Sequence, residues 1–306
     1  MKTQQLLITA VVAAIAAFAF ITHFKKADAL DRQPPLVAIA NYGPHSSLDA
    51  TIEGVKKGLA EKGFVENETV RYIISDVGFD TSLIPQMITQ LVARKPQVLV
   101  TLATPIAQCA KGMVKDIPLI FTAVTDPVAA ELIESESQPD QNITGSSERQ
   151  DFNALLTFAR KLLPSTQRIG LLYGTGENND HALLIMLKEA AKKADMKLVA
   201  LPVNATRDIP IVMQQFKGAI DLLYVGSSGT IQPALPTIAK IADDMDTPVL
   251  NVNQEAVQNG MVLGSFGVDF VRVGFHAGRL VAQVLKGAPI KNLPPHYPTL
   301  VDHTAF

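Results

Sequence analysis

Hydrophobic and polar positions follow two patterns along the chain, one typical of buried strands and the other of amphipathic helices. Between residues 48 and 62 apolar residues recur at helical spacing, and Gly63 follows them as a helix stop. Uninterrupted apolar runs, such as the one at 98–102, are typical of strands buried on both faces of a parallel sheet. The predicted strands are 36–40, 70–75, 98–102, 119–121, 169–173, 197–202, 222–225, 249–250 and 261–265. The predicted helices are 48–62, 82–94, 105–113, 152–163, 181–194, 209–216, 231–243 and 271–285.

The alternation of strands with helices predicts an α/β fold in which parallel sheets are covered on both faces. A length of 306 residues predicts two domains. We therefore expect two Rossmann-like lobes. The Pro-rich segment 289–298 is expected to run across the surface as a tether rather than to form a helix.

Composition excludes three classes of protein. A hydrophobic fraction of 47% is enough for real cores, so the chain is not intrinsically disordered. The chain is not a disulfide-rich scaffold, because its single cysteine, Cys109, cannot form a disulfide within the chain. We expect Cys109 to be a small core residue. A net charge of −2 argues against a strongly basic nucleic-acid-binding protein, so we expect no nucleic-acid partner.

The N-terminus carries the features of an export signal. An uncharged apolar run at 6–22 follows Lys2, and the small residues Ala27 and Ala29 frame a cleavage site after it. We expect residues 1–29 to be a signal peptide that is removed, so that the mature protein is periplasmic. The alternative is that the run is retained as a membrane anchor, although Lys25 and Lys26 directly after it count against the usual orientation of such an anchor.

Polar residues gather in the turns that follow the predicted strands. In parallel sheets these turns lie together beyond the carboxyl ends of the strands, where ligands bind. Thr104 followed by Pro105 is predicted to cap a helix whose free backbone N–H groups would favour an anion. The turns are 41–47, 103–105, 122–127, 173–179, 226–230, 251–253 and 266–269.

The sequence lacks the common motifs of enzymes. Neither a phosphate-binding G-x-x-x-x-G-K-[ST] loop nor a G-x-S-x-G nucleophile motif is present, and the histidines form no metal-ligand pattern. Asp126 and Asp269 could form a catalytic carboxylate pair, but a helix cap or a hydrogen-bond acceptor is the expected role of each. We therefore expect no cofactor, no metal and no enzymatic activity.

Several stretches resemble one bacterial family, the ABC-transporter substrate-binding proteins whose better-known members take up aromatic amino acids. The most specific stretch is D-I-P-L-I-F-T-A-V-T-D-P at 116–127. The similarity extends over essentially the whole mature chain. The supporting stretches are 45–49, 103–108, 142–145, 162–164, 169–173 and 264–269.

The resemblance implies a periplasmic-binding-protein fold of type I, with two lobes that are joined by three crossings and close on a ligand. By similarity, the crossings are expected near Gly145, Val252 and Lys286. The first lobe would then comprise 30–145 plus 252–286, and the second lobe 146–251 plus 287–306.

The resemblance also implies where a ligand binds. Thr104, Ala123 and Thr125 are expected to hold a carboxylate, and Asp269 to accept a hydrogen bond from an α-ammonium group. Aromatic rings are expected to stack on the ligand's side chain. The complete set of expected ligand-binding residues is Tyr42, His45, Thr104, Ala123, Thr125, Asp126, Tyr173, Ser227, Ser228, Asn253, Phe266 and Asp269.

The chain departs from the family's common sequence at two places. Ser227-Ser228-Gly229-Thr230 stands where the family commonly has Thr-Asp-Asn-Thr, and Asn253 stands near a common acidic position. Each change removes a possible carboxylate partner of an ammonium group, and a lost charge-assisted hydrogen bond costs roughly 1.5–3 kcal/mol.

These observations predict an exported, monomeric solute-binding protein that captures a small ligand, expected to be an amino acid. It would deliver this ligand to an inner-membrane ABC permease. The alternative is a sensory module of the same fold that serves a membrane signalling partner. An enzyme on an α/β scaffold is disfavoured by the missing motifs.

Overall fold

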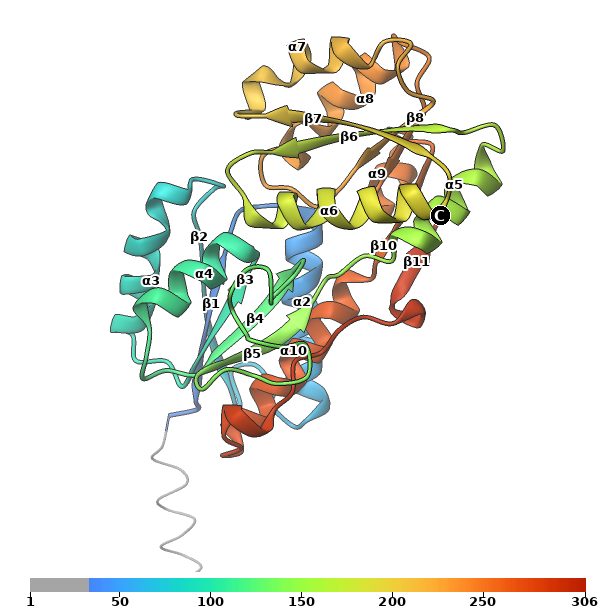
Figure 1. Ribbon diagram of the computed structural model, residues 1–306. Helices are drawn as coiled ribbons and strands as arrows, with labels where there is room; N and C mark the ends of the chain where they lie inside the picture. Colours follow the sequence, from blue (N-terminus) through green and yellow to red (C-terminus); the bar gives the residue numbers. More distant parts are fainter. Residues whose placement is uncertain (1–32) are drawn as a thin grey trace, which may run out of the picture. The chain divides into compact units, whose positions relative to one another are not determined.

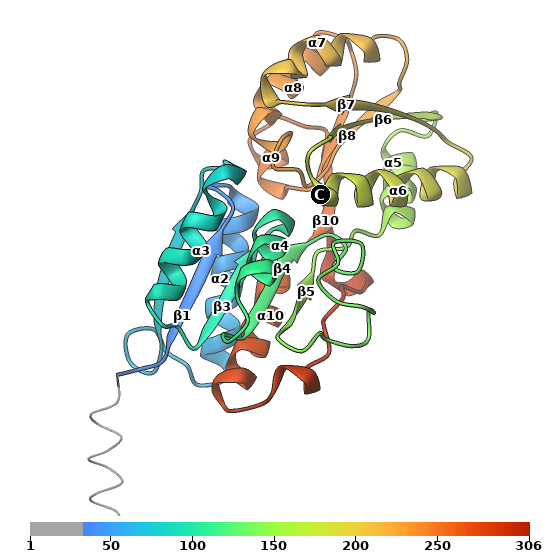
Figure 2. The same ribbon diagram turned by 60° about the vertical axis from the view of Figure 1, so that its left-hand side comes forward.

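The computed structural model describes residues 33–306, and the expected signal peptide lies outside them. The first lobe is built on a five-stranded parallel sheet with the strand order β2-β1-β3-β4-β5 (Figure 1). Its strands are β1 (Leu36–Asn41), β2 (Arg71–Asp76), β3 (Val98–Leu102), β4 (Leu119–Val124) and β5 (Ile143–Ser147). Helices α3 (Ile84–Ala93) and α4 (Thr104–Met113) cover one face, and α2 (Ser46–Glu61) and α10 (Phe270–Leu285) cover the other (Figure 2).

The second lobe is built on a six-stranded sheet with the order β11-β10-β9-β8-β6-β7. All its pairs are parallel except that of β11 with β10. Helices α5 and α6 pack on one face, and α7, α8 and α9 pack on the other. The strands are β6 (Arg168–Gly174), β7 (Lys197–Val203), β8 (Leu222–Val225), β9 (Val249–Asn251), β10 (Gly264–Val268) and β11 (His303–Ala305). The helices are α5 (Phe152–Leu162), α6 (Asn178–Lys193), α7 (Ile209–Met213), α8 (Leu235–Asp243) and α9 (Gln254–Gln258).

The predicted α/β class and the two parallel sheets are confirmed. Of the α-helices and strands in the described chain, β5, α9 and β11 were not predicted. Strand β5 has the sequence ITGSS and all five of its residues are buried, so no apolar run marks it. A Cβ on its Gly145 would overlap the carbonyl oxygen of Phe121, so glycine permits the strand to pair closely with β4. Helix α9 and strand β11 are too short to show a period.

The chain crosses between the lobes three times. One crossing lies close to its expected place, and the other two lie elsewhere. The first crossing, between β5 and α5, lies close to the expected one. The second lies at Asp269 rather than near Val252, because β10 pairs with β9 and therefore remains in the second sheet. The third lies beyond His296 rather than near Lys286, because His296 bridges to Ser146 on β5. Segment 252–268 thus belongs to the second lobe and segment 287–296 to the first.

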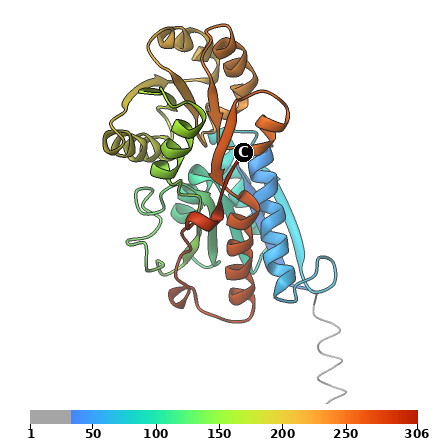
Figure 3. The same ribbon diagram turned by 90° about the vertical axis from the view of Figure 1, so that its right-hand side faces the viewer.

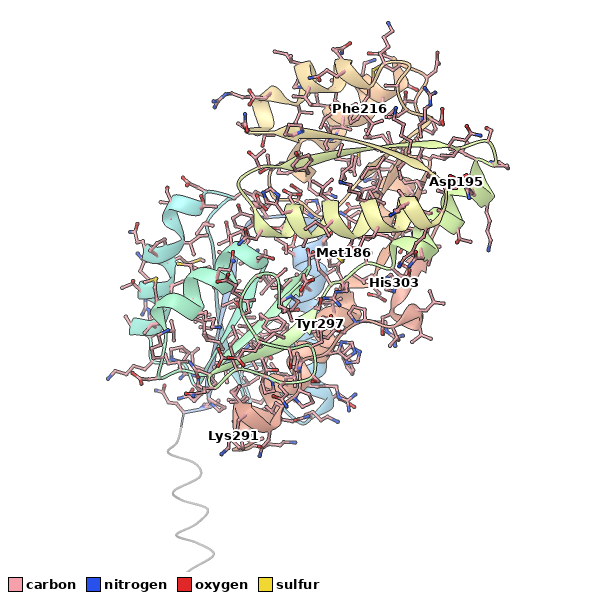
Figure 4. The ribbon with its side chains drawn as sticks, in the orientation of Figure 1. Met186, Asp195, Phe216, Lys291, Tyr297 and His303 are labelled. Carbon is pink, nitrogen blue, oxygen red and sulfur yellow. The ribbon has the colours of Figure 1, made fainter. Side chains whose placement is uncertain are left out.

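The third crossing can be followed along the C-terminal tail in Figure 4. Tyr297 lies beside the first lobe, with its ring 4.7 Å from the guanidinium carbon of Arg149, and His303 lies beside the second lobe. The tail forms no long helix, as its prolines predict. Among the described residues, no helix is long and apolar enough to cross a membrane.

Helices α2 and α10 lie side by side with four glycines at their contact (Figure 3). Gly54 and Gly58 are on α2, and Gly274 and Gly278 are on α10. A Cβ at any of the four would overlap a backbone carbonyl oxygen of the opposite helix. The missing side chains therefore set the distance between the two helices.

Two imidazole rings stack where α10 meets the tail. The ring centroids of His276 and His296 are 3.6 Å apart with an interplanar angle of 9°, and a carboxylate oxygen of Asp302 lies 3.9 Å from Nε2 of His276. Burial and the neighbouring imidazole lower the pKa of His296 to about 4, and burial also lowers the pKa of His276. Arg272 adds to both effects, whereas Asp302 opposes them.

We expect this histidine pair to make the folded protein less stable as the pH falls from about 6.5 to about 4. In that range the unfolded chain binds protons that the buried rings exclude, so the free energy of unfolding falls with the pH. Thermal unfolding between pH 7.5 and 4 measures the effect. Other groups titrate in this range, so the comparison is with His296→Phe, which keeps a ring and should flatten the profile. Equal losses of melting temperature in both proteins would contradict the assignment.

Candidate functional site

A cavity lies between the loops that follow the strands of the two sheets. Its free space, including the open mouth, is about 500 Å³. The first lobe contributes the segments after β1, β2, β3 and β5, the end of β4 and the start of α10. The second lobe contributes the segments after β6, β8 and β9. The lining residues are Tyr42, His45, Ser47, Leu48, Phe79, Ala103, Thr104, Ala123, Glu148, Glu177, Asn179, Ser227, Ser228, Gly229, Gln232, Val252 and Phe270.

The middle of the first-lobe wall is formed by strained backbone in the turn after β3 and at an irregularity near the end of β4. Ala103 and Ala123 both have positive φ values, 73° and 52°, which are uncommon for residues with a side chain and are found at functional sites. Ala103, rather than Thr104, is the residue that precedes helix α4, and no side chain caps this helix. The hydroxyl of Thr104 is buried and has no hydrogen-bond partner within the described chain. This helix start can therefore accept an anion.

Glu148 supplies a negative charge at one end of the cavity. The residue is 3% exposed, and its Oε1 accepts hydrogen bonds from the hydroxyls of Thr125 at 3.0 Å and Ser227 at 2.8 Å. Burial raises the pKa of this carboxyl to about 7, and the two hydroxyls only partly oppose this effect. A cation in the cavity would compensate the charge.

The opposite end of the cavity is aromatic and also carries a carboxylate. The Tyr42 hydroxyl donates to Oε1 of Glu177 at 3.3 Å, which joins the two lobes. The ring of Phe79 lies edge-on to that of Tyr42, with centroids 5.4 Å apart. Glu177 also accepts hydrogen bonds from the backbone N–H of Gly229 and the hydroxyl of Thr230.

Among the residues that the structure describes, no lysine or arginine lines the cavity. His45 does line the cavity, and it caps helix α2 by accepting a hydrogen bond from the N–H of Ser47 at Nδ1. Burial lowers the pKa of His45, so its imidazole is neutral at pH 7. The cavity therefore combines two carboxylates with one uncapped helix start.

The structure brings six of the expected site residues to the cavity: Tyr42, His45, Thr104, Ala123, Ser227 and Ser228. Thr125 lies one hydrogen bond behind it, on Glu148. The other five are not among the lining residues: Asp126, Tyr173, Asn253, Phe266 and Asp269.

Those five residues have other contacts. Asp126 accepts hydrogen bonds from two backbone N–H groups of the following turn and pairs with Arg149. Asp269 caps helix α10, where it accepts a hydrogen bond from the N–H of Arg272. Three further side chains complete the set: Tyr173 lies against His181, Phe266 stacks on His303, and Asn253 accepts a hydrogen bond from Ser47 at 2.7 Å.

Two carboxylates that were not among the expected site residues line the cavity, and a third lies behind it. Glu148 and Glu177 both line the cavity, and Asp180 lies behind it with its Oδ2 accepting a hydrogen bond from Ser228 at 2.8 Å. Glu148 directly follows β5, the strand that the sequence did not reveal. Glu177 lies in a turn that was expected at the cleft. Its hydrogen bond with Tyr42, which joins the two lobes, distinguishes it from the other residues of that turn, and the sequence does not show this contact.

Comparison with known proteins identifies the family. The model of the family described as "ABC transporter substrate binding protein" matches residues 36–302. The tyrosine-binding protein of Clostridioides difficile is 29% identical over 268 residues, which are 88% of this chain and 76% of that protein.

Two solved structures share the fold. One is a conserved domain protein from Vibrio cholerae, with a TM-score of 0.83, 30% identity, and 89% of this chain and 91% of that chain covered. The other is an ABC domain in complex with L-Trp from Streptococcus pneumonia, with a TM-score of 0.82, 28% identity, and 87% and 90% covered. The fold is that of type I periplasmic binding proteins, and the chain belongs to the ABC transporter substrate-binding protein family.

Proposed function

We propose that the protein is the exported receptor of an ABC importer and that it captures an L-amino acid between its lobes. The observation that carries this proposal is that one cavity is lined both by a buried carboxylate, Glu148, and by an uncapped helix start at Thr104. An amino acid carries the two complementary charges, an ammonium and a carboxylate, on one carbon atom.

The strand order supports one orientation of the bound ligand in the cavity. Glu148 follows β5, Ala123 lies near the end of β4, Thr104 follows β3 and Tyr42 follows β1. These strands are consecutive in the sheet. The α-ammonium would bind Glu148, and the α-carboxylate would bind the start of α4. Three strand spacings, about 14 Å, separate β5 from β1, so the ligand's side chain would extend towards Tyr42 and Phe79.

Hydrogen bonds between the lobes support capture by closure. Ser227 donates to Glu148, Tyr42 donates to Glu177, and Ser47 donates to Asn253. A ligand that contacts both walls binds the closed form more tightly and shifts the population towards it. The permease would then recognise the closed receptor. The apolar run at 6–22 supports export.

The test is a thermal-shift and calorimetry screen of the purified protein against L-amino acids, each with its methyl ester and its N-acetyl derivative. We expect at least one amino acid with an aromatic side chain to bind. At a hundredfold excess over Kd it should stabilise the fold by about 2.7 kcal/mol. The ester lacks the carboxylate and the N-acetyl derivative lacks the ammonium, so both should bind far more weakly. Equal binding of all three forms, or binding of an unrelated solute alone, would overturn the proposal.

A further inference from the structure

We propose that the Tyr42–Glu177 end of the cavity selects ligands whose aromatic side chain ends in an O–H or N–H group. This inference rests on the proposed function, because it concerns the side chain of an amino acid whose backbone groups lie at Glu148 and Thr104. It assigns the selection to Glu177, together with Asn179 and Gln232.

Two residues of the second-lobe wall carry acceptors that lack donors within the described chain. The side-chain oxygens of Asn179 and Gln232 are buried, and neither has a hydrogen-bond partner within the described chain. Their amide nitrogens donate to the carbonyl oxygens of Ser227 at 3.3 Å and Gly226 at 2.8 Å, which fixes the identity of the free atoms as oxygens. Both residues line the cavity, and a buried acceptor without a donor carries a desolvation cost.

Glu177 adds a carboxylate to this wall. It is 6% exposed and accepts hydrogen bonds from three uncharged groups: the Tyr42 hydroxyl, the Gly229 N–H and the Thr230 hydroxyl. Burial raises the pKa of Tyr42 above its usual range, so the phenol keeps its proton and donates it to Glu177. Two carboxylate oxygens offer about four acceptor positions, which leaves room for one more donor.

Gly229 makes this arrangement possible. A Cβ at this position would overlap the ring of Tyr42 and would lie 2.8 Å from Oε1 of Glu177. The glycine therefore lets an aromatic ring of the first lobe reach a carboxylate of the second. It stands where the family resemblance implies asparagine, so this wall differs from the common one.

The neighbouring walls favour an aromatic ligand with an uncharged donor. Leu48, Phe79 and Phe270 line the cavity together with Tyr42 and provide apolar surface. Glu177 already has three hydrogen bonds, whereas Glu148 has two from hydroxyls alone, so the ligand's positive charge belongs at Glu148. A phenol or an indole supplies the missing donor at the far end, and a phenyl ring does not.

The experiment measures the Kd of L-tyrosine, L-tryptophan and L-phenylalanine by calorimetry for the wild type, Glu177→Gln and the control Glu189→Gln. Glu189 is an exposed residue of α6, the helix that Glu177 precedes, and it is not among the residues that line the cavity. We expect the wild type and the control to bind tyrosine or tryptophan roughly ten- to a hundredfold more tightly than phenylalanine. Glu177→Gln should reduce this ratio about tenfold, because a change in closure alone acts on all three ligands alike.

The outcomes separate the two proposals. If none of the three amino acids binds the wild type, the proposed function fails, and the selection rule fails with it. If all three bind with equal affinity, the selection rule alone is overturned. If Glu177→Gln raises the Kd of all three ligands by the same factor, Glu177 stabilises the closed form and does not select the ligand's side chain, and its assignment is overturned. If that variant does not fold, the ratio in the wild type still decides the rule.

Discussion

Alanine at position 274 is expected to lower the free energy of unfolding by about 3 kcal/mol, near the upper end of the range for overpacked sites. Its Cβ would overlap the carbonyl oxygen of Thr51, a backbone atom of α2 that no rotamer change can move away. Helices α2 and α10 would have to separate, and they carry the packing on one face of the first sheet. For a protein of this size the melting temperature should fall by roughly 6–12 °C.

A matched control is available in helix α4. Gly112 also lies within a helix, but a Cβ there would meet no atom within 4 Å. Gly112→Ala should therefore be neutral or stabilising by up to about 1 kcal/mol, because alanine has the higher helix propensity. Differential scanning calorimetry of both variants tests the contact. Similar melting temperatures for Gly274→Ala and Gly112→Ala would show that the two helices can separate at little cost.

Much of the fold could be predicted because its strands are buried on both faces and its helices are amphipathic. Strand β3 is fully buried and its apolar run was found with the correct ends. Strand β5 is equally buried, but its Thr, Gly and Ser residues satisfy their polar groups through tertiary contacts, such as the hydrogen bond from Thr144 to the carbonyl oxygen of Leu293. That partner is distant in the sequence, so no local pattern can reveal it.

The crossings between the lobes show the same limit. The resemblance implied a crossing near Val252, but the chain first forms α9 and β10 in the second lobe. Strand β10 has the sequence GSFGV and was only partly covered by the predicted strand at 261–265. The position of β10 is determined by its pairing with β9 and β11. A local sequence pattern cannot reveal such pairing, because the paired segments are separate in the chain.

The loops that line the cavity could be predicted from the sequence, whereas the side chains that contact one another within it could not. Tyr42 and Thr104 were expected at the cleft because parallel strands align their carboxyl ends. Glu148 was missed with the strand that precedes it. Asp269, expected to meet an ammonium group, instead caps the helix that it precedes. A carboxylate in a loop can serve either role, and only the three-dimensional structure separates the two.

Glu148→Gln is expected to weaken ligand binding by roughly 30-fold to several thousandfold. The substitution keeps the shape of the side chain and a hydrogen-bonding oxygen for Ser227, but it removes the charge opposite the ligand's ammonium group. Loss of one partner from a buried, hydrogen-bonded charge pair costs about 2–5 kcal/mol, and each 1.4 kcal/mol is a factor of ten in Kd. The control is Glu134→Gln, an exposed carboxylate of the first lobe that lies outside the cavity.

The pH dependence of binding distinguishes a lost charge from a damaged site. Burial raises the pKa of Glu148 to about 7, so in the empty wild type this carboxyl takes up a proton as the pH falls below that value. The neutral form binds an ammonium group poorly, so Kd should rise as the pH falls from 8 to 5, by up to tenfold per pH unit below the pKa. The Glu148→Gln profile should be flat over the same range, since glutamine does not titrate.

The empty variant should also be more stable than the empty wild type at pH 8. There the wild type must keep Glu148 ionised although burial favours the protonated form, and the free energy of unfolding falls as the pH rises from about 4.5 to about 7. Glutamine removes this penalty, so a higher melting temperature together with weaker binding is the expected pair of results. A variant that binds as tightly as the wild type, or whose Kd keeps the same pH dependence, would show that Glu148 does not hold the ligand's cation.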